Sequence, residues 1–354
     1  MPDVLEKSEH QQIFADVIVP HYLAHLKPQT SPKAIFLAGQ PGAGKGGMGR
    51  NASQELGDCV VVDPDELRPF HPRYSQYQQE DPDNAASQVH PDASAWAKEL
   101  IKESIKRKVN VIVDGTLASP DSAIKKIGQF KDGDYAVEIH AIAVKKEISK
   151  EGVRARYERA AAEKRDLLAQ AEEAKGKGEM EEYARLKEQS DAIIPRNVPD
   201  DIQDHAYDGM MASIDRIQKE GLVDRMAVFE RGNGLLADTA DGGDPLAALV
   251  KKRTDPMTIP EAEQYKGSTT QTLDWMRGRV EDFRTQGRDD EADELDEQCE
   301  VMLSIRAKAF QDWMAMLDAL YPTPEPKQEK SPRCSLLHRG LSIGTSPKNP
   351  LCGM

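Results

Sequence analysis

The sequence has few cysteines and no long apolar run. Its 354 residues contain four cysteines, Cys59, Cys299, Cys334 and Cys352, and their spacing forms neither a CxxC pair nor a set of metal ligands. Unpaired thiols are typical of a reducing compartment. No stretch approaches the ~18 apolar residues of a membrane-spanning helix, and no basic segment with an apolar core opens the chain. We therefore expect a soluble, cytoplasmic protein without membrane contact.

Positive charge is also in short supply. The chain has 47 Lys and Arg against 61 Asp and Glu, which gives a formal net charge of -14. Such a surface repels phosphate backbones and so loses the main source of affinity for nucleic acids. The composition predicts no nucleic-acid partner, but it is compatible with a small phosphorylated substrate in a local basic pocket.

Glycine, by contrast, is concentrated in one loop that follows the apolar run 34–38. Small residues and a proline force a tight turn there, so that backbone N–H groups can converge on an anion at the start of the next helix. The spacing of Gly39, Gly44 and Lys45 matches a Walker A loop, in which the lysine reaches the β- and γ-phosphates. The alternative is a glycine turn that binds nothing. The predicted ATP-binding residues are Gly39, Gln40, Pro41, Gly42, Ala43, Gly44, Lys45, Gly46 and Gly47.

This loop departs from the Walker A pattern at one position. A Ser or Thr normally follows the lysine and binds Mg²⁺ through its hydroxyl, but Gly46 follows Lys45 here. Either Mg²⁺ is held through water and carboxylates elsewhere, for which Asp63 is the candidate ligand, or the metal site is weakened.

Apolar runs rich in Val and Ile alternate with amphipathic stretches, a pattern that predicts a mostly parallel sheet flanked by helices. The expected strands are 34–38, 59–62, 109–113, 135–144 and 225–230. Because ligands of such sheets bind at the carboxyl ends of the strands, the glycine loop and the segments 63–65 and 114–116 should share one rim. The fold class is thus α/β.

The rest of the chain is predicted to be largely helical. We expect an N-terminal helical segment (1–30), a catalytic domain (31–241) with a charged helical insertion (about 160–192), a helical C-terminal region (242–326) and a disordered tail (327–354). The C-terminal region is predicted to contain two helices, 259–286 and 289–320, separated at Gly287.

Acidic residues follow two of the expected strands. Asp65 is placed to act as a general base for an acceptor hydroxyl, although it could equally cap the next helix. Asp114 leaves a buried Val-Ile-Val run, where a carboxylate is costly without a partner. It could bind acceptor hydroxyls or Mg²⁺, or could form a structural turn.

Two arginines could stabilise charge on a phosphoryl group in transfer. Arg156 is expected to open the long charged helix, and Arg196 lies between prolines in a stiff loop. The alternative for each is a surface ion pair.

Taken together, these segments resemble the zeta toxin family, the kinases of bacterial toxin–antitoxin pairs. The resemblance covers about residues 30–240 and rests on five segments in order: 39–45, 61–65 with His71-Pro72, 111–116, 143–158 and Arg196. It implies a P-loop kinase fold, ATP and Mg²⁺ as cofactors, and an antitoxin protein as partner. It also implies phosphorylation of the 3'-hydroxyl of the aminosugar in UDP-N-acetylglucosamine.

The resemblance assigns roles to individual residues. It implies that Lys45 binds the β- and γ-phosphates and that Asp65 is the base. The implied substrate contacts are Asp65, Glu99, Asp114 and Thr116, and Arg156 and Arg196 would stabilise the phosphate in transfer.

Three departures from the family pattern keep other functions open. Gly46 replaces the hydroxyl residue, Asp114 replaces a glutamate, and Ala118 stands where a basic residue often follows. One alternative is a kinase of another acceptor, such as a dinucleotide or an antibiotic hydroxyl. The other is a catalytically weakened nucleotide-binding protein that acts on a partner through its helical C-terminal region.

Overall fold

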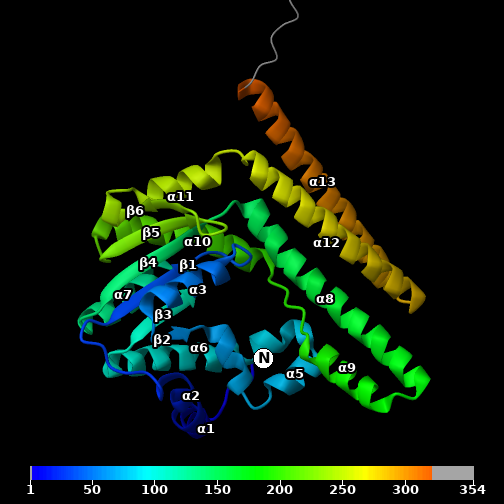
Figure 1. Ribbon diagram of the computed structural model, residues 1–354, viewed down its shortest axis with the longest axis horizontal. Coiled ribbons are helices and arrows are strands. Elements are labelled where there is room, and N and C mark those ends of the chain that lie inside the picture. The colour runs from blue at the N-terminus through cyan, green and yellow to red at the C-terminus, as the bar shows by residue number, and fades with distance from the viewer. Residues whose placement is uncertain (1, 321–354) are drawn as a thin grey trace, which may run out of the picture. The chain divides into compact units, whose positions relative to one another are not determined.

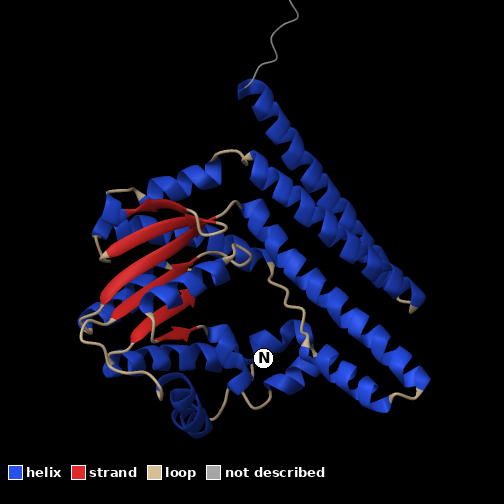
Figure 2. Cartoon of the chain, viewed as in Figure 1, coloured by secondary structure: helices blue, strands red, loops and turns tan. Residues whose placement is uncertain are grey.

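The computed structural model describes residues 2–320 and contains a six-stranded sheet in the order β2-β3-β1-β4-β5-β6 (Figures 1 and 2). All neighbouring strands are parallel except β5 and β6. The strands are β1 Lys33–Ala38, β2 Cys59–Val62, β3 Asn110–Gly115, β4 Ala136–Ala143, β5 Arg225–Glu230 and β6 Leu235–Asp238. The first five lie where the sequence predicts strands. The sixth was not predicted.

The two faces of the sheet bury alternate residues of each strand, as pleating requires. In β1, Phe36 packs in a large cluster that includes residues of α6, α7 and α10. The intervening Ile35 and Leu37 pack in a second cluster with α3, α8 and α12. Both faces are therefore covered, which explains the nearly continuous apolar run of β1.

Helices connect and cover the strands (Figure 1). Those before β4 are α1 Lys7–Ile13, the π-helix η1 Phe14–Ile18, α2 Val19–Leu23, α3 Lys45–Leu56, α4 Pro64–Leu67, the 3₁₀ helix η2 Arg68–Phe70, α5 Tyr74–Glu80, α6 Pro82–Arg107 and α7 Pro120–Asp132. Those after it are α8 Lys146–Lys177, α9 Met180–Ala192, α10 Asp200–Glu220, the 3₁₀ helix η3 Thr239–Asp241, α11 Pro245–Thr254, α12 Ile259–Thr285 and α13 Asp289–Leu320.

The predicted helical insertion is the hairpin of α8 and α9. The break between the two helices lies at Gly178, where φ is 79° and the backbone is left-handed. The expectation that Arg156 opens the long helix is wrong. The helix begins at Lys146, directly after β4, so Arg156 lies on its third turn.

The predicted C-terminal pair is α12 and α13, which are separated at Gly287, where φ is 71°. A capping box of Thr258 and Glu261 starts α12. The two helices share an apolar core of their own that includes Leu273 and Cys299. Residues up to Trp313 form one compact unit. The proline-rich stretch and the tail expected to be disordered (321–354) lie outside the described residues.

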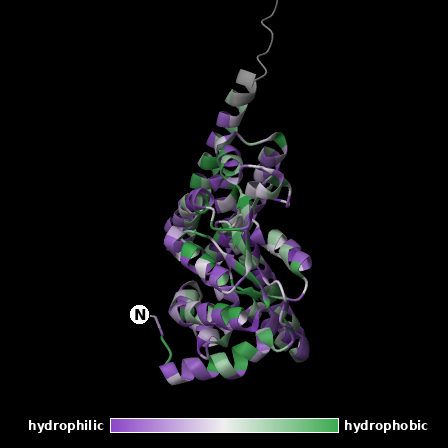
Figure 3. Cartoon of the chain, turned by 90° about the vertical axis from the view of Figure 1, so that its left-hand side faces the viewer, coloured by the Kyte–Doolittle hydropathy of each residue, from purple (hydrophilic) through white to green (hydrophobic). Residues whose placement is uncertain are grey.

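The outer helices carry both hydrophilic and hydrophobic residues along their length (Figure 3). Within residues 2–320, no helix combines the length and the apolar character needed to cross a membrane.

Candidate functional site

The glycine loop connects β1, which ends at Ala38, to α3, which begins at Lys45. Its curvature depends on two left-handed residues, Gly42 with φ 77° and Gly44 with φ 99°. Gly44 is also the N-cap of α3. The N–H groups in the first turn of a helix have no carbonyl partner within the helix, so they and the helix dipole favour an anion at this position.

The side chain of Gln40 ties the loop to the protein and is itself fully buried. Its Nε2 donates to the carbonyl of Val144 over 3.2 Å, and its Oε1 accepts from Nη2 of Arg253 over 3.0 Å. Arg253 stacks on the ring of Tyr207 at 3.8 Å. Burial lowers the pKa of Arg253 to about 10. Gln40 is therefore a structural anchor of the loop.

Two further side chains hold the carbonyls of the loop. Nε2 of Gln203 on α10 donates to the carbonyl of Pro41 over 3.2 Å. Nη2 of Arg231, in the turn after β5, donates to the carbonyl of Gly42 over 3.1 Å. The loop is thus fixed through its carbonyls and Gln40. In the first turn of α3, the N–H of Gly47 makes a long bond of 3.4 Å to the carbonyl of Gly44.

Lys45 and Asp114 lie next to each other at the carboxyl ends of β1 and β3. Nζ of Lys45 donates to the carbonyl of Gly39 over 2.8 Å and lies 3.9 Å from Oδ1 of Asp114. Burial raises the pKa of the Asp114 carboxyl, Lys45 opposes this shift, and Asp65 adds to it. An acidic and a basic side chain therefore face the same space beside the loop.

Asp63 and Asp65 follow β2 on the same rim. Asp63 is the N-cap of α4, and its carboxylate accepts from the N–H of Asp65 over 2.8 Å. Burial raises the pKa of Asp63 to about 6; the N–H of Asp65 lowers it, while the charges of Asp65 and Asp114 raise it further. The charges of these carboxylates act on one another, but among the residues that the structure describes no group of three or more acidic, His or Cys side chains is placed to hold a metal ion.

Arg156 lies close to the charges of Asp65 and Arg196. Burial lowers the pKa of the Arg156 guanidinium, the neighbouring Arg196 lowers it further, and Asp65 raises it. Oδ1 of Asp65 also lies 2.5 Å from Nη2 of Arg68. We call Lys45, Asp65, Asp114, Arg156 and Arg196 the charged group, because the contact of Lys45 with Asp114 and the effects of these charges on the pKa values of Asp114 and Arg156 link them.

Thr116 and Glu99 have other contacts. The hydroxyl of Thr116 accepts from the N–H of Ala118 over 3.3 Å, in the turn that ends β3. Oε1 of Glu99 accepts from Nε2 of Gln11 over 3.1 Å and lies 3.6 Å from Nε2 of His10. Because α6 runs from the rim back toward the start of β3, the second half of this helix carries Glu99 to α1. The structure does not place Glu99 in the charged group.

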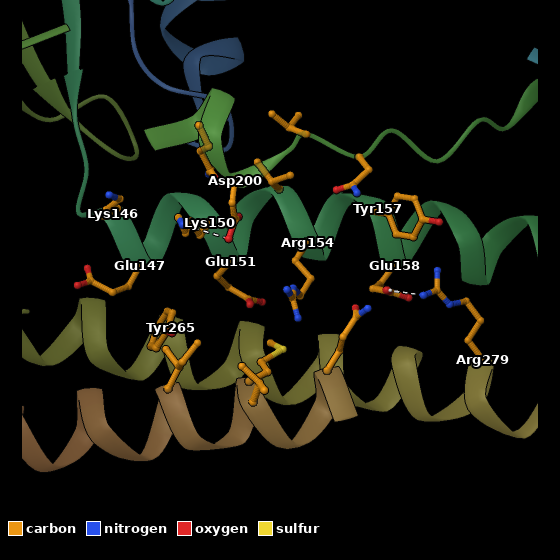
Figure 4. Close-up of a pocket in the computed structure, with 18 of the residues that line it drawn as sticks. Lys146, Glu147, Lys150, Glu151, Arg154, Tyr157, Glu158, Asp200, Tyr265 and Arg279 are labelled. Atoms are coloured by element: carbon orange, nitrogen blue, oxygen red, sulfur yellow. Dashed lines mark ion pairs between the residues drawn. The ribbon is translucent and has the colours of Figure 1, made fainter. Parts of the chain in front are cut away.

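A cavity of about 590 Å³ lies on another side of α8, between that helix and α12 and α13 (Figure 4). Its α8 wall includes Glu151, Arg154 and Glu158, and its opposite wall includes Tyr265 and Val301. The members of the charged group do not line this cavity.

Comparison with known proteins decides the family. Residues 21–240, well over half of the chain, match the family model described as Zeta toxin. The chain belongs to the zeta toxin family. This match contains the glycine loop and the whole charged group.

Individual zeta toxins are similar to this chain over part of their length. Toxin PezT of Streptococcus pneumoniae is 32% identical over 133 residues, which are 37% of this chain and 53% of PezT. Toxin zeta of Streptococcus agalactiae is 24% identical over 193 residues, 54% of this chain and 62% of the relative. The matches thus span between half and two thirds of these curated relatives.

A solved structure of the PezAT chromosomal toxin–antitoxin system of Streptococcus pneumoniae is similar in fold. It aligns with a TM-score of 0.61 and 20% identity, over 77% of this chain and 99% of that chain. The zeta toxin fold is thus present here, with a mostly parallel sheet like that of P-loop kinases.

Sequence reasoning missed three side chains around the loop of this zeta toxin. Arg231 and Asn233 lie in the turn between β5 and β6, and the amide of Asn233 lies 3.1 Å from the position of a Cβ added to Gly47. Arg253 lies on α11, beyond the family match. The only sequence signal for the first two was a short Arg-Gly-Asn-Gly turn after a predicted strand.

Proposed function

We propose that this zeta toxin is an ATP-dependent kinase of a small molecule, and that its acceptor is the 3'-hydroxyl of the aminosugar of UDP-N-acetylglucosamine. The observation that carries the proposal is the distance of 3.9 Å between Lys45 Nζ and Asp114 Oδ1 at the mouth of the glycine loop. The loop binds the terminal phosphates of ATP through its N–H groups and Lys45, while Asp114 and Thr116 contact the acceptor.

Phosphoryl transfer depends mainly on positioning and charge neutralisation. In the proposed reaction Asp65 accepts the proton of the attacking hydroxyl as its oxygen bonds to the γ-phosphorus of ATP, and ADP leaves. Arg156 and Arg196 neutralise charge on the phosphoryl oxygens. Asp65 is suited to this role because its side chain is 47% exposed and can therefore reach a bound acceptor. Its negative charge also raises the pKa of Arg156, one of the two arginines proposed to neutralise the phosphoryl oxygens.

Mg²⁺ would be held by Asp63, together with the phosphates of ATP. Mg²⁺ in kinases is usually bound by one or two carboxylates and substrate phosphates, and a cation beside Asp63 would favour its ionised form against the burial that raises its pKa to about 6. The ion would supply neutralisation of phosphate charge. Gly46 contributes no hydroxyl, so Asp63 would hold the metal without it.

The test is transfer of phosphate from ATP to UDP-N-acetylglucosamine by the purified protein with Mg²⁺, measured by mass spectrometry of the product. We expect Lys45→Ala to reduce the rate by at least about 100-fold, because it removes a preorganised positive charge from the phosphates. Lys106→Ala, at an exposed position on α6, is the matched control and should keep the rate. Transfer that survives in Lys45→Ala would contradict the role of Lys45.

A panel of nucleotide sugars, dinucleotides and antibiotics in the same assay would identify the acceptor. Transfer to a dinucleotide or an antibiotic, and to no nucleotide sugar, would support the kinase activity but would show that the acceptor is a different one.

One observation favours a second candidate function. The missing hydroxyl at Gly46 is the change expected of a nucleotide-binding protein with weakened catalysis. Such a protein would bind ATP with no turnover on any acceptor in the panel. For either function we propose an antitoxin protein as partner, in keeping with the similar structure, which comes from a toxin–antitoxin system.

A further inference from the structure

Helix α8 packs directly against the glycine loop. A Cβ added to Gly152 would lie 2.5 Å from the carbonyl oxygen of Gly42 and 2.9 Å from Nη2 of Arg231. A Cβ added to Gly42 would lie 2.0 Å from the carbonyl oxygen of Ser149. The backbones of α8 and the loop are therefore in contact, and there is no space for a side chain between them.

The residue before Gly152 is Glu151, which is only 6% exposed and points from α8 toward α12 (Figure 4). Its Oε1 accepts from the hydroxyl of Thr272 over 2.7 Å and from that of Ser268 over 3.0 Å. Both donors lie on α12, which is outside the residues matched by the family model. A buried carboxylate is costly unless such donors satisfy it.

Glu151 also acts on Arg231, which holds the carbonyl of Gly42. Burial lowers the pKa of the Arg231 guanidinium, and Glu151 is the acidic charge that opposes this shift. Burial raises the pKa of Glu151, and the hydroxyls of Thr272 and Ser268, then the charges of Arg154 and Arg231, lower it. A line of contacts thus leads from α12 through Glu151 and the backbone of α8 to Gly42.

We infer that Glu151 is a positioning residue for the nucleotide-binding loop, and that α12 is part of the same device through the hydroxyls of Ser268 and Thr272. The hydroxyls keep the carboxylate in place, and the carboxylate in turn holds the turn of α8 that contains Ser149 and Gly152 against Gly42. The loop then keeps the curvature in which its N–H groups face the phosphates. The consequence for ATP affinity rests on the proposed function, whereas the consequence for the loop itself does not.

The test compares Glu151→Gln and Thr272→Val with Thr269→Val. The first removes the charge at nearly constant volume, and the second removes the hydroxyl. Thr269 is an equally buried threonine on α12, and its hydroxyl donates to the carbonyl of Lys266 within the same helix. The hydroxyl of Thr272 likewise lies 3.0 Å from the carbonyl of Ser268, so the contact with Glu151 is what distinguishes the two positions. Thr269→Val is therefore the matched control.

The first readout is amide hydrogen exchange of residues 39–47 in the protein without ligand. The second is the dissociation constant for ATP, measured by calorimetry beside that for the acceptor. We expect Glu151→Gln and Thr272→Val to speed exchange in the loop and to weaken ATP binding by roughly three- to tenfold, with acceptor binding unchanged. Thr269→Val should change neither, and circular dichroism should show all three variants folded.

The outcomes separate this inference from the proposed function. Loop exchange that stays as slow in both variants as in the unaltered protein would overturn the inference, whatever ATP does. Faster exchange in a protein that binds no ATP would support the positioning role and refute the kinase. An equal change in Thr269→Val would mean that α12 acts only through general stability, which also overturns the inference.

Discussion

The glycines of the loop differ in how strongly their backbone conformation and surroundings require glycine. Gly42 and Gly44 have positive φ, and a side chain at Gly42 would collide with the backbone of α8. Gly46 is under neither constraint. A Cβ at this position would meet only Nη1 of Arg50, at 3.9 Å. The position that departs from the Walker A pattern therefore has space for the missing hydroxyl.

We expect Gly46→Ser to strengthen Mg²⁺ binding, because it supplies the hydroxyl that the Walker A loop uses as a metal ligand. The Mg²⁺ concentration that gives half of the maximal kinase rate should fall by roughly tenfold, the lower end of the effect that changes around a metal site have on affinity. Titration of the rate with Mg²⁺ measures this. Gly46→Ala adds the Cβ without the hydroxyl and serves as control. An equal shift in both variants would assign the effect to the helix and not to the metal.

At the residue scale, the sequence predicted the side chains whose positions follow from strand ends. Lys45, Asp63, Asp65 and Asp114 lie on one rim because parallel strands carry them there. The position of Glu99 could not be predicted in this way, because it depends on which side of α6 faces the rim and which faces α1. Arg231 was missed because only tertiary packing brings the turn after β5 to Gly42.

At the scale of elements, strands with buried apolar residues were predictable, including the four-residue edge strand β2, whereas the other edge strand, β6, was not. β6 also has four residues, but its Leu235 is 51% exposed, so it carries no buried pattern. The start of α8 was missed for another reason. The charged residues 146–152 lack an apolar stripe, although α8 packs on the loop and on α12 through them.

A charged network joins four strands near the beginning of β4. Glu138 on β4 is 5% exposed; its Oε1 lies 3.1 Å from Nζ of Lys33, and its Oε2 lies 3.0 Å from Nη1 of Arg225. Arg225 also pairs with Asp238 of β6 over 2.7 Å. His140, followed by Lys33 and Arg225, lowers the pKa of Glu138 to about 2 despite its burial.

We expect Glu138→Gln to lower the free energy of unfolding by about 1–3 kcal/mol at neutral pH, because Lys33 and Arg225, which are both partly exposed, lose the buried carboxylate that pairs with them. The folded-state pKa of Glu138 is depressed, so its contribution is present above the ordinary value of 4.5 and is lost as the pH falls toward about 2. The difference between the two proteins should shrink over that range. Urea unfolding at several pH values measures it, and a difference that stays constant with pH would contradict the assigned charge.

At the scale of the molecule, α8 connects the nucleotide-binding loop to the C-terminal helices. One side contacts the glycine loop at Gly42, and another holds α12 through Glu151. The composition of the sequence changes near residue 242, which led to a predicted domain boundary there. Composition reports local character, however, and cannot show that a helix beyond that boundary packs on α8.

We expect the C-terminal pair to unfold together with the sheet. Leu273→Ala removes a side chain that is 2% exposed in the core of α12 and α13, which should cost about 2–4 kcal/mol. Circular dichroism and the fluorescence of Trp96, with the other two tryptophans replaced by phenylalanine, should report the same lowered urea midpoint. Trp96 is fully buried against the sheet.

The control for this prediction is Ile259→Ala, at a position on α12 that is 53% exposed, which should leave the midpoint unchanged. A Trp96 transition that keeps its midpoint while the helical signal falls earlier would show that the pair melts by itself.

The contact between Glu151 and α12 makes an acid on one helix depend on hydroxyls of another. A carboxylate closed off from water is tolerable only while its donors persist. A chain shortened before α12 would leave Glu151 without the hydroxyls of Ser268 and Thr272. We therefore expect a neutral side chain at position 151 to suit such a shortened chain better than the acid.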